Sequence, residues 1–236
     1  MRFLYVAPRY HTNQVPIIRG LKRKGHEVCF LSQYAGKVED YSDLTPTVIG
    51  YSGFFLFFDR IYMALMKNRD AYAGDRKMKC GFPPIGKLKR AIRDSHGDVA
   101  VLRERSVYSI CAYLLCKKYK IPAILYNQSP LWEDCIKNDP AHRLMRLLTP
   151  TVRMTPVMGV QDDRKVKEPG AAFVPFVMEP EQKAEEKRWI KNGITHIFSI
   201  GKYEERKNHR MLVEIVEELS AVYNIHLTIA GERTTS

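Results

Sequence analysis

The chain has 236 residues, with 38 Lys and Arg against 26 Asp and Glu, and its formal net charge is +12. Hydrophobic residues make up 45% and charged residues 27%, which is the composition of a globular protein and excludes wholesale disorder. The 14 glycines and 13 prolines exclude collagen-like and proline-rich linker proteins. The basic balance indicates an anionic partner, which could be nucleic acid, anionic lipid or a nucleotide phosphate.

The five cysteines are odd in number and form no Cys-x-x-Cys pair. We therefore expect no disulfide framework and no metal site, and a cytoplasmic protein. The most apolar stretch, residues 54–66, is interrupted by Asp59 and Arg60. It is shorter than the roughly 20 apolar residues of a membrane-spanning helix, so we expect none.

The first forty residues predict a β-α-β unit. Residues 3–7 form a continuous apolar run, which is typical of a buried parallel strand. A helix follows, which Thr12 or Asn13 can cap and which Gly25 ends in the left-handed conformation. Residues 26–31 then predict a second strand. A strand, a helix and a parallel strand make the repeating unit of an open α/β sheet.

The alternation of strands and helices continues along the chain. We expect strands or extended segments over 47–51, 99–102, 123–126, 152–160 and 172–177, and helices over 54–68, 85–94, 106–119 and 140–147. A second β-α-β unit follows, with strands over 196–201 and 225–230 and a helix that begins near residue 207.

We therefore predict an α/β protein with two Rossmann-like parts. A Rossmann-like N-terminal domain spans 1–178. The strongly charged residues 179–191 are expected to be helical, and 179–194 to form a linker. Residues 195–236 form the first β-α-β of a second Rossmann-like domain, because one helix and two strands cannot close such a domain.

Residues 201–208 are the most informative segment, because they join an apolar strand to an amphipathic helix. Gly201 allows close approach of a ligand to the backbone at the edge where open α/β sheets bind ligands. Arg206, Lys207 and Arg210 lie near the helix N-terminus, where the helix dipole disfavours cations and a bound anion would reverse the balance. The alternative is a solvated turn in which neighbouring glutamates neutralise the cations.

This segment resembles one that is found in a known family. Gly201 and Lys202, followed by Lys207, are similar to the G-[RK]-x-x-x-x-K segment of GT-B glycosyltransferases of the family 4 type. Residues 21–28 resemble that family's L-x-x-x-G-H-E-V entry to the second strand. Val174-Pro175 and residues 225–232 resemble its interdomain segment and its next strand with the G-[DE] that follows. The resemblance implies that Gly201, Lys202 and Lys207 bind the diphosphate of a nucleotide sugar.

The chain also departs from the family pattern. Residues 9–13 replace the family's Gly-Gly loop, and the position of its mid-domain histidine falls near Asn127 and Gln128. The E-x7-E segment that holds the sugar in the family is absent. We therefore expect a truncated C-terminal domain with an incomplete donor site, and a chain that can be inactive alone.

An inverting transferase also needs a general base for the acceptor hydroxyl. The candidates at the ends of predicted strands are His11, Glu104 and Glu133, and His11 is preferred because it follows the first strand. The alternative for each is an ordinary loop residue. The acceptor-side cleft is expected to contain Tyr10, Thr12, Asn13, Glu104, Asn127 and Gln128.

The segment 60–93 carries ten basic residues against two acidic ones and follows a cluster of phenylalanines, Phe54, Phe55, Phe57 and Phe58. Aromatic side chains beside cations can dock on an anionic membrane. The alternative is that the phenylalanines belong to the core and the cations to a solvated face. Nucleic-acid binding is the least favoured, because it needs aromatics interleaved with cations.

We therefore expect a glycosyltransferase of polysaccharide biosynthesis. It would move a sugar from a nucleotide-sugar donor to a glycan or lipid-linked acceptor, without a cofactor. It would lie in the cytoplasm, or peripherally at the inner face of the membrane. The alternatives are a non-catalytic fragment that binds acceptor or membrane, and a sugar-nucleotide epimerase of related architecture.

Overall fold

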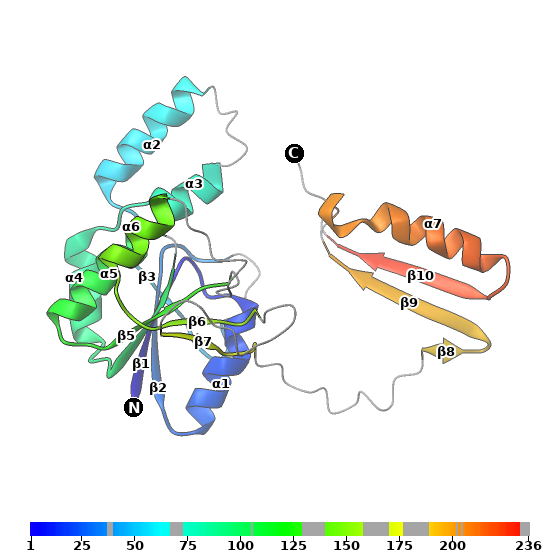
Figure 1. Cartoon of the computed structure of the whole chain (residues 1–236), viewed down its shortest axis with the longest axis horizontal. Helices are drawn as coiled ribbons and strands as arrows, with labels where there is room; N and C mark the ends of the chain where they lie inside the picture. Colours follow the sequence, from blue (N-terminus) through cyan, green and yellow to red (C-terminus); the bar gives the residue numbers. More distant parts are fainter. Residues whose placement is uncertain are drawn as a thin grey trace. The chain divides into compact units, whose positions relative to one another are not determined.

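The computed structural model describes residues 1–36, 40–66, 73–104, 106–128, 140–157, 170–176, 189–201, 203 and 205–231. The chain forms two compact units, Met1–Met178 and Glu179–Ser236. Figure 1 shows a sheet with helices against it in the first unit, and a smaller sheet with a helix alongside it in the second.

The first unit is built on a seven-stranded sheet whose order is β3-β2-β1-β4-β5-β6-β7. Every neighbouring pair in it is parallel. The strands are β1 Arg2–Ala7, β2 Glu27–Ser32, β3 Thr47–Val48, β4 Val99–Arg103, β5 Ala123–Tyr126, β6 Arg153–Thr155 and β7 Ala171–Phe173. The chain runs outward from β1 to β3 and then returns to β4 on the other side of β1. The carboxyl ends of β1 and β4 therefore form the switch point at which open α/β sheets bind ligands.

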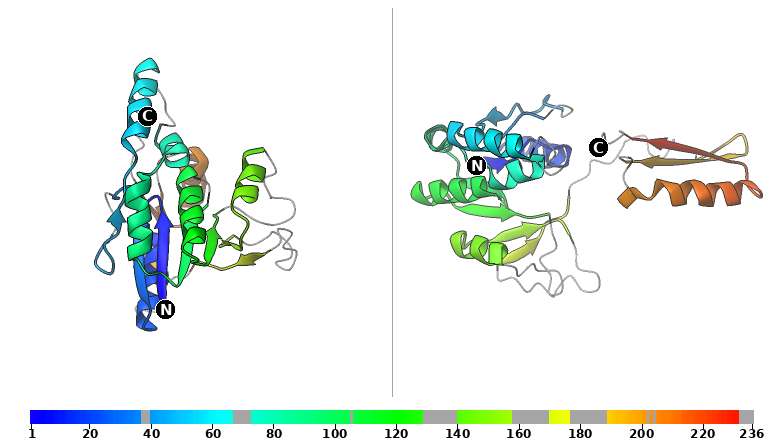
Figure 2. Two further views of the ribbon diagram at one scale, coloured as in Figure 1. Left: turned by 90° about the vertical axis from the view of Figure 1, so that its left-hand side faces the viewer. Right: turned by 90° about the horizontal axis from the view of Figure 1, so that it is seen from above.

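α1 covers one face of this sheet, and α4 and α5 cover the other. The helices described in this unit are the short 3-10 helix η1 Thr12–Gln14, α1 Val15–Arg23, α2 Gly53–Leu65, α3 Ala73–Cys80, α4 Ile85–Asp94, α5 Val107–Lys118 and α6 Pro140–Leu148. Figure 2 shows α4 and α5 side by side against the sheet.

The core has two clusters because alternate residues of a strand face opposite sides of the sheet. On one side Leu4 and Val6 of β1 pack with Leu88 of α4 and other buried residues of α4 and α5. On the other side Tyr5 of β1 packs with Ile18 of α1. The alternation along one strand thus holds a helical layer on each face.

The second unit contains β8 Ile190–Lys191, β9 Ile194–Ile200, the 3-10 helix η3 Glu205–Lys207, α7 His209–Ser220 and β10 Ile225–Ala230. The sheet order is β10-β9-β8, with β9 and β10 parallel and joined through α7. β8 and β9 form a hairpin whose turn residues, Asn192 and Gly193, have φ of 52° and 75°. An Asn-Gly pair suits such a turn because both positions need positive φ.

The predicted α/β class, with a Rossmann-like sheet followed by a β-α-β unit, is confirmed. Three local expectations are corrected. His11 caps the first helical turn instead of Thr12 or Asn13, and α3 was not expected. Residues 190–191 are a strand and not a helix, because the Asn-Gly turn folds them onto β9. The rest of the expected charged helix, 179–188, lies outside the described residues.

Helix α2 contributes nothing to the core, since none of its residues is buried. Phe54, Phe57 and Phe58 are 74%, 59% and 51% exposed, and Leu65 is 77% exposed. The reading of these phenylalanines as core residues is therefore wrong, and only Phe55 is partly covered, beside Tyr51. An apolar helix face left in contact with solvent usually marks an interaction surface.

Leu102, which is fully buried at the centre of the sheet, is a direct test of this core. We expect Leu102→Ala to lower the free energy of unfolding by about 2–5 kcal/mol, because the substitution leaves a cavity that the sheet cannot close. Leu147→Ala on α6 is the matched control, since Leu147 is 75% exposed, and it should change stability by less than about 0.5 kcal/mol. Urea unfolding measures both, and equal effects would contradict the assigned core.

Candidate functional site

A cavity of about 260 Å³ lies at the carboxyl ends of β1, β4 and β5. Its wall comes from the loop after β1, from η1 and from the strand ends. The polar residues that line it are Arg9, His11, Asn13, Gln14, Arg103 and Gln128. The cavity therefore occupies the switch point of the sheet, where a ligand is expected.

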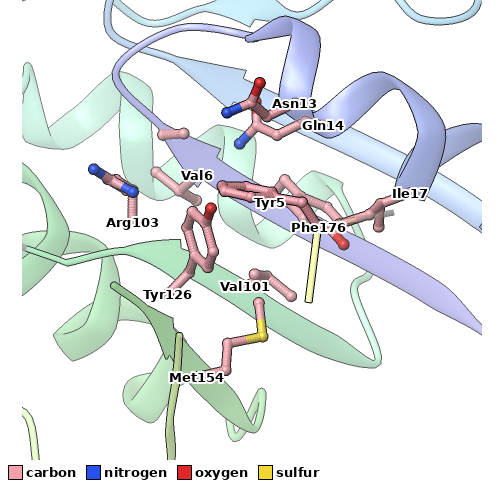
Figure 3. Close-up of a pocket in the computed structure, with 11 residues that line it drawn as sticks. Tyr5, Val6, Asn13, Gln14, Ile17, Val101, Arg103, Tyr126, Met154 and Phe176 are labelled. Atoms are coloured by element: carbon pink, nitrogen blue, oxygen red, sulfur yellow. The ribbon is translucent and has the colours of Figure 1, made fainter. Parts of the chain in front are cut away.

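A smaller hollow of about 30 Å³ adjoins the cavity and shares Asn13, Arg103 and Tyr126 with it. Its floor is apolar and includes Val101 and Met154. Figure 3 shows Arg103, Tyr126 and Asn13 arranged around this hollow from three different elements. The site thus combines an apolar base with a polar rim, as small-molecule sites usually do.

His11 lies at this cavity, and its ring also caps the first helical turn. Nδ1 accepts a hydrogen bond from the Asn13 backbone N–H at 3.2 Å, and the His11 backbone N–H donates to Gln14 Oε1 at 2.9 Å. A neutral imidazole that accepts at Nδ1 carries its proton on Nε2. In this arrangement Nε2 carries the N–H, and the ring must release the cap before Nδ1 can take a proton.

Arg103 is held in place at the end of β4. Its guanidinium lies over the Tyr126 ring, 5.2 Å from the centroid, and donates to Gln128 Oε1 at 2.6 Å. Burial raises the pKa of Tyr126, while the hydrogen bond from Gln128 and the charge of Arg103 act in the opposite direction. Tyr126 therefore presents a neutral hydroxyl at neutral pH.

Glu104 and Arg153 form a buried ion pair behind the cavity. Arg153 Nε donates to Glu104 Oε1 at 2.9 Å, and the two side chains are 5% and 6% exposed. Asn127 Nδ2 donates to the other carboxylate oxygen at 2.7 Å. Arg153 also donates to the backbone oxygens of Thr149 and Thr151. Each polar group of the pair is thus satisfied, which is what a buried ion pair requires.

The sequence did not point to Arg153, since a single arginine in a short extended segment carries no motif. In the structure Glu104 pairs with Arg153 on β6, and Asn127 donates a hydrogen bond to the same carboxylate. The carboxylate proposed as a general base is therefore held in an ion pair in the interior.

The other expected cleft residues are divided between the core and the cavity. Tyr10 is fully buried, 5.2 Å from the Phe30 ring, and burial raises its pKa to about 12, so it serves the core. Thr12 lies beside His11, with its hydroxyl 3.2 Å from Nδ1. Asn13 and Gln128 do line the cavity. Glu133 lies outside the described residues.

The expected donor segment lies in the second unit. A Cβ added at Gly201 would sit 3.4 Å from Lys207 Cε, so the aliphatic part of Lys207 covers this glycine at the end of β9. Asn208 begins α7 with φ of 49° and makes no side-chain capping hydrogen bond. Lys202 lies outside the described residues. The structure thus brings Gly201, Lys207 and a helix N-terminus together, and their role in donor binding stays a prediction.

Within the described ranges, no group of three His, Cys, Asp or Glu side chains is placed to hold a metal ion. No protein-family model and no curated protein sequence matches this chain.

Several solved structures resemble the chain in fold. The glycotransferase of kitacinnamycin is 16% identical with a TM-score of 0.54, and the match covers 100% of this chain and 67% of that one. A structure described as trehalose-6-phosphate from E. coli bound with UDP-2-fluoro glucose is 13% identical with a TM-score of 0.57, covering 100% and 65%. A putative UDP-N-acetylglucosamine 2-epimerase from Listeria monocytogenes is 10% identical with a TM-score of 0.52, covering 100% and 63%.

At these identities the likeness establishes the fold. The chain has the Rossmann-like α/β fold of the GT-B glycosyltransferases and related epimerases, and it spans about two thirds of the length of these structures.

Substitution of Glu104 tests whether the buried Glu104–Arg153 ion pair stabilises the folded first unit. We expect Glu104→Gln to lower the free energy of unfolding by about 3–5 kcal/mol, because it leaves the Arg153 charge buried without its counterion. Glu214→Gln is the matched control. It breaks the Arg210–Glu214 pair on α7, where the two side chains are 92% and 55% exposed, and should cost less than about 1 kcal/mol. Chemical denaturation compares the two, and equal losses would contradict a structural role for the buried pair.

Proposed function

We propose that the chain belongs to a glycosyltransferase of the family 4 type, which moves a sugar from a nucleotide-sugar donor to a hydroxyl of an acceptor. In this proposal the second unit binds the donor diphosphate through Gly201, Lys202 and Lys207. The first unit binds the acceptor in the 260 Å³ cavity at the switch point. The observation that carries the proposal is the placement of Lys207 across Gly201, beside the N-terminus of α7.

The electrostatics of this segment suit a departing diphosphate. Negative charge builds on the diphosphate as the glycosidic bond breaks, and fixed cations stabilise that charge without a metal. The first N–H groups of α7 add a positive dipole end to the same place. The fold supports this proposal, since one of the similar structures is bound with UDP-2-fluoro glucose.

The acceptor hydroxyl loses a proton during transfer, and His11 is the proposed base. For that role the imidazole must accept the proton on a free ring nitrogen. Its Nδ1 takes part in the cap of η1 and its Nε2 then carries the proton, so binding of the acceptor would have to displace the Asn13 N–H before either ring nitrogen can act as the base. The proposal therefore couples the base to a rearrangement of the loop after β1.

A sugar-nucleotide epimerase is the second candidate, because a putative UDP-N-acetylglucosamine 2-epimerase has the same fold. Incubation with UDP-N-acetylglucosamine separates the two reactions. Epimerisation yields a new UDP-sugar without any acceptor, whereas transfer releases UDP only when an acceptor is present. Acceptor binding with no donor binding would instead favour a non-catalytic binding fragment.

The donor assignment is tested by calorimetric titration with UDP. We expect Lys202→Ala and Lys207→Ala each to weaken UDP binding by about tenfold to a hundredfold, because each removes a hydrogen bond to a charged group. Lys191→Ala, on β8 of the same unit, is the control and should bind UDP as the unchanged chain does. Unchanged affinity in both test variants would remove the donor-site assignment.

We also propose that the enzyme works at an anionic membrane, with α2 as the docking element. Phe54, Phe57, Phe58, Ile61 and Leu65 recur at helical spacing and are all exposed. Asp59, on another side of α2, pairs with Arg76 and Lys77 of α3 at 2.8 and 3.7 Å.

The charge around α2 points to an anionic surface. The segment 60–93 carries ten basic residues and two acidic ones, and each cation near such a surface contributes about 1 kcal/mol to binding. None of the helices in the described part of the chain is long and apolar enough to span a bilayer. An exposed apolar face flanked by cations fits binding in the plane of the interface, where a lipid-linked acceptor would lie.

Co-sedimentation with anionic vesicles tests the membrane proposal. We expect the triple variant Phe54→Ser, Phe57→Ser, Phe58→Ser to bind at least about tenfold more weakly, because three apolar side chains no longer enter the interface. The matched control replaces Leu144, Leu147 and Leu148, the exposed leucines of α6, with serine. Binding should also fall at high salt. Salt-independent binding, or equal losses in the two triple variants, would contradict this role of α2.

A further inference from the structure

We propose that a second cavity of the first unit, between the segments that follow β2 and β3 and helix α3, binds a sugar ring of the acceptor. In this proposal the ring stacks on Tyr34, and its hydroxyls donate hydrogen bonds to Asp75. The name acceptor for the molecule that carries the sugar rests on the proposed function. Sugar binding itself rests only on the first unit and can be measured without any donor.

The first argument is the size and position of this cavity. Its volume of about 480 Å³ lies within the roughly 300–1,000 Å³ of most small-molecule sites. It shares Tyr34 and Met78 with the cavity of about 260 Å³ at the switch point. A molecule whose reacting hydroxyl lies beside His11 can therefore extend past Tyr34 into the second cavity. The described lining of that cavity consists of Tyr34, Tyr51, Gly74, Asp75, Lys77 and Met78.

The second argument is the aromatic ring of Tyr34, which is 37% exposed and lines both cavities. Its backbone N–H donates to the oxygen of Pro8 at 3.1 Å, so the loop after β1 holds this residue next to the switch point. The face of an aromatic ring is negative, and the C–H groups on one side of a pyranose ring are weakly positive. A half-exposed tyrosine at the junction of two cavities thus suits stacking against a sugar.

The third argument is preorganisation of the Tyr51 wall. Its hydroxyl donates to Oε1 of Gln33 at 2.9 Å, and Gln33 is 2% exposed. Lys77 Nζ lies 5.4 Å from the centroid of the Tyr51 ring. On another side the ring lies so close to Gly81 that no side chain fits at that position. The wall is therefore in place before a ligand binds, which lowers the entropic cost of binding.

The fourth argument is the polar chemistry of α3, which separates a sugar from a hydrocarbon chain. Asp75 pairs with Lys79 at 2.5 Å, and the two side chains are 45% and 54% exposed. A carboxylate has about four lone-pair sites, so Asp75 can accept hydrogen bonds from sugar hydroxyls while it keeps this ion pair. A hydrocarbon chain would remove Asp75 and Lys77 from water without offering them a hydrogen bond, which is costly. The lining therefore favours a ring that carries hydroxyls.

Saturation-transfer NMR on the whole chain, without a donor, tests whether a sugar binds. The probes are the methyl glycosides of glucose, mannose, galactose and N-acetylglucosamine. We expect at least one to bind, with the strongest saturation on the C–H protons of one face of its ring, because that face stacks on Tyr34. Octyl glucoside below its micelle concentration should likewise receive saturation on its ring. Saturation of its octyl protons alone, or no binding of any methyl glycoside, would overturn the proposal.

Substitutions assign the binding to this cavity. We expect Tyr34→Ala to weaken binding of the best methyl glycoside at least about tenfold, and Tyr34→Phe to keep most of the affinity, because the ring and not the hydroxyl makes the stack. Asp75→Asn should weaken binding about tenfold, since it removes a charged hydrogen-bond acceptor. Full affinity in both Tyr34→Ala and Asp75→Asn would overturn the site.

Two control variants match these substitutions. Tyr223→Ala removes a tyrosine that is 60% exposed in the second unit, and Asp94→Asn removes a carboxylate whose side chain is 53% exposed on α4. Both should bind the methyl glycoside as the unchanged chain does. Losses equal to those of the test variants would contradict a specific site.

The outcome is separable from that of the donor assignment and from misfolding. Tyr34→Ala should bind UDP as the unchanged chain does, because the expected donor segment lies in the second unit. Sugar binding without UDP binding would keep this site and remove the donor assignment, and the reverse result would remove this site alone. In the unchanged chain, the best methyl glycoside should slow nitration of Tyr34 by tetranitromethane but not that of Tyr223, as peptide mass spectrometry would show. Equal nitration of Tyr34 with and without the sugar would overturn the proposal.

Discussion

The buried ion pair between Glu104 and Arg153 holds three strands together at the carboxyl edge of the first sheet, and the cavity at that edge depends on it. It joins β4 to β6, and Asn127 adds β5 through the second carboxylate oxygen. Removing a carboxylate from water is costly unless its lone pairs are satisfied, and here they are. As a result the only acidic group near Arg103 in sequence is neutralised in the interior. The cavity in front of the pair is lined by Arg9 and Arg103.

The first unit presents two different surfaces, a cavity and an exposed helix face. The cavity gathers hydrogen-bond donors over an apolar floor, and α2 presents aromatic side chains to solvent. Both features fit the lipid-linked acceptor proposed above, whose polar and apolar parts need different surroundings. Pairing of Asp59 with Arg76 and Lys77 links α2 to α3, and residues of α3 line the cavity that adjoins the one at the carboxyl ends of β1 and β4. The functional proposals for the first unit therefore depend on neighbouring elements.

Part of the candidate site was predictable because parallel strands end at one edge of the sheet. His11, Asn13 and Gln128 follow β1 and β5, and the cavity contains all three. Tyr10 was expected beside them, but its large ring fills the space against Phe30 and Tyr41 and lies in the core. Arg153 was missed because its partner is 49 residues away, and no local pattern records that pairing. For Lys207, the sequence indicated a helix start, and the structure added its contact with Gly201.

The sequence by itself determined the α/β class and the alternation of strands and helices, though not α3 or β8, because apolar periodicity and glycine positions act over a few residues. It also placed the cations near the start of α7. Only the tertiary structure decided which side chains meet. It turned Glu104 inward, stacked Arg103 on Tyr126 and left the α2 phenylalanines outside the core. Those outcomes depend on packing and on electrostatic interactions between segments that are distant in the sequence. A local stretch of sequence does not determine either of them.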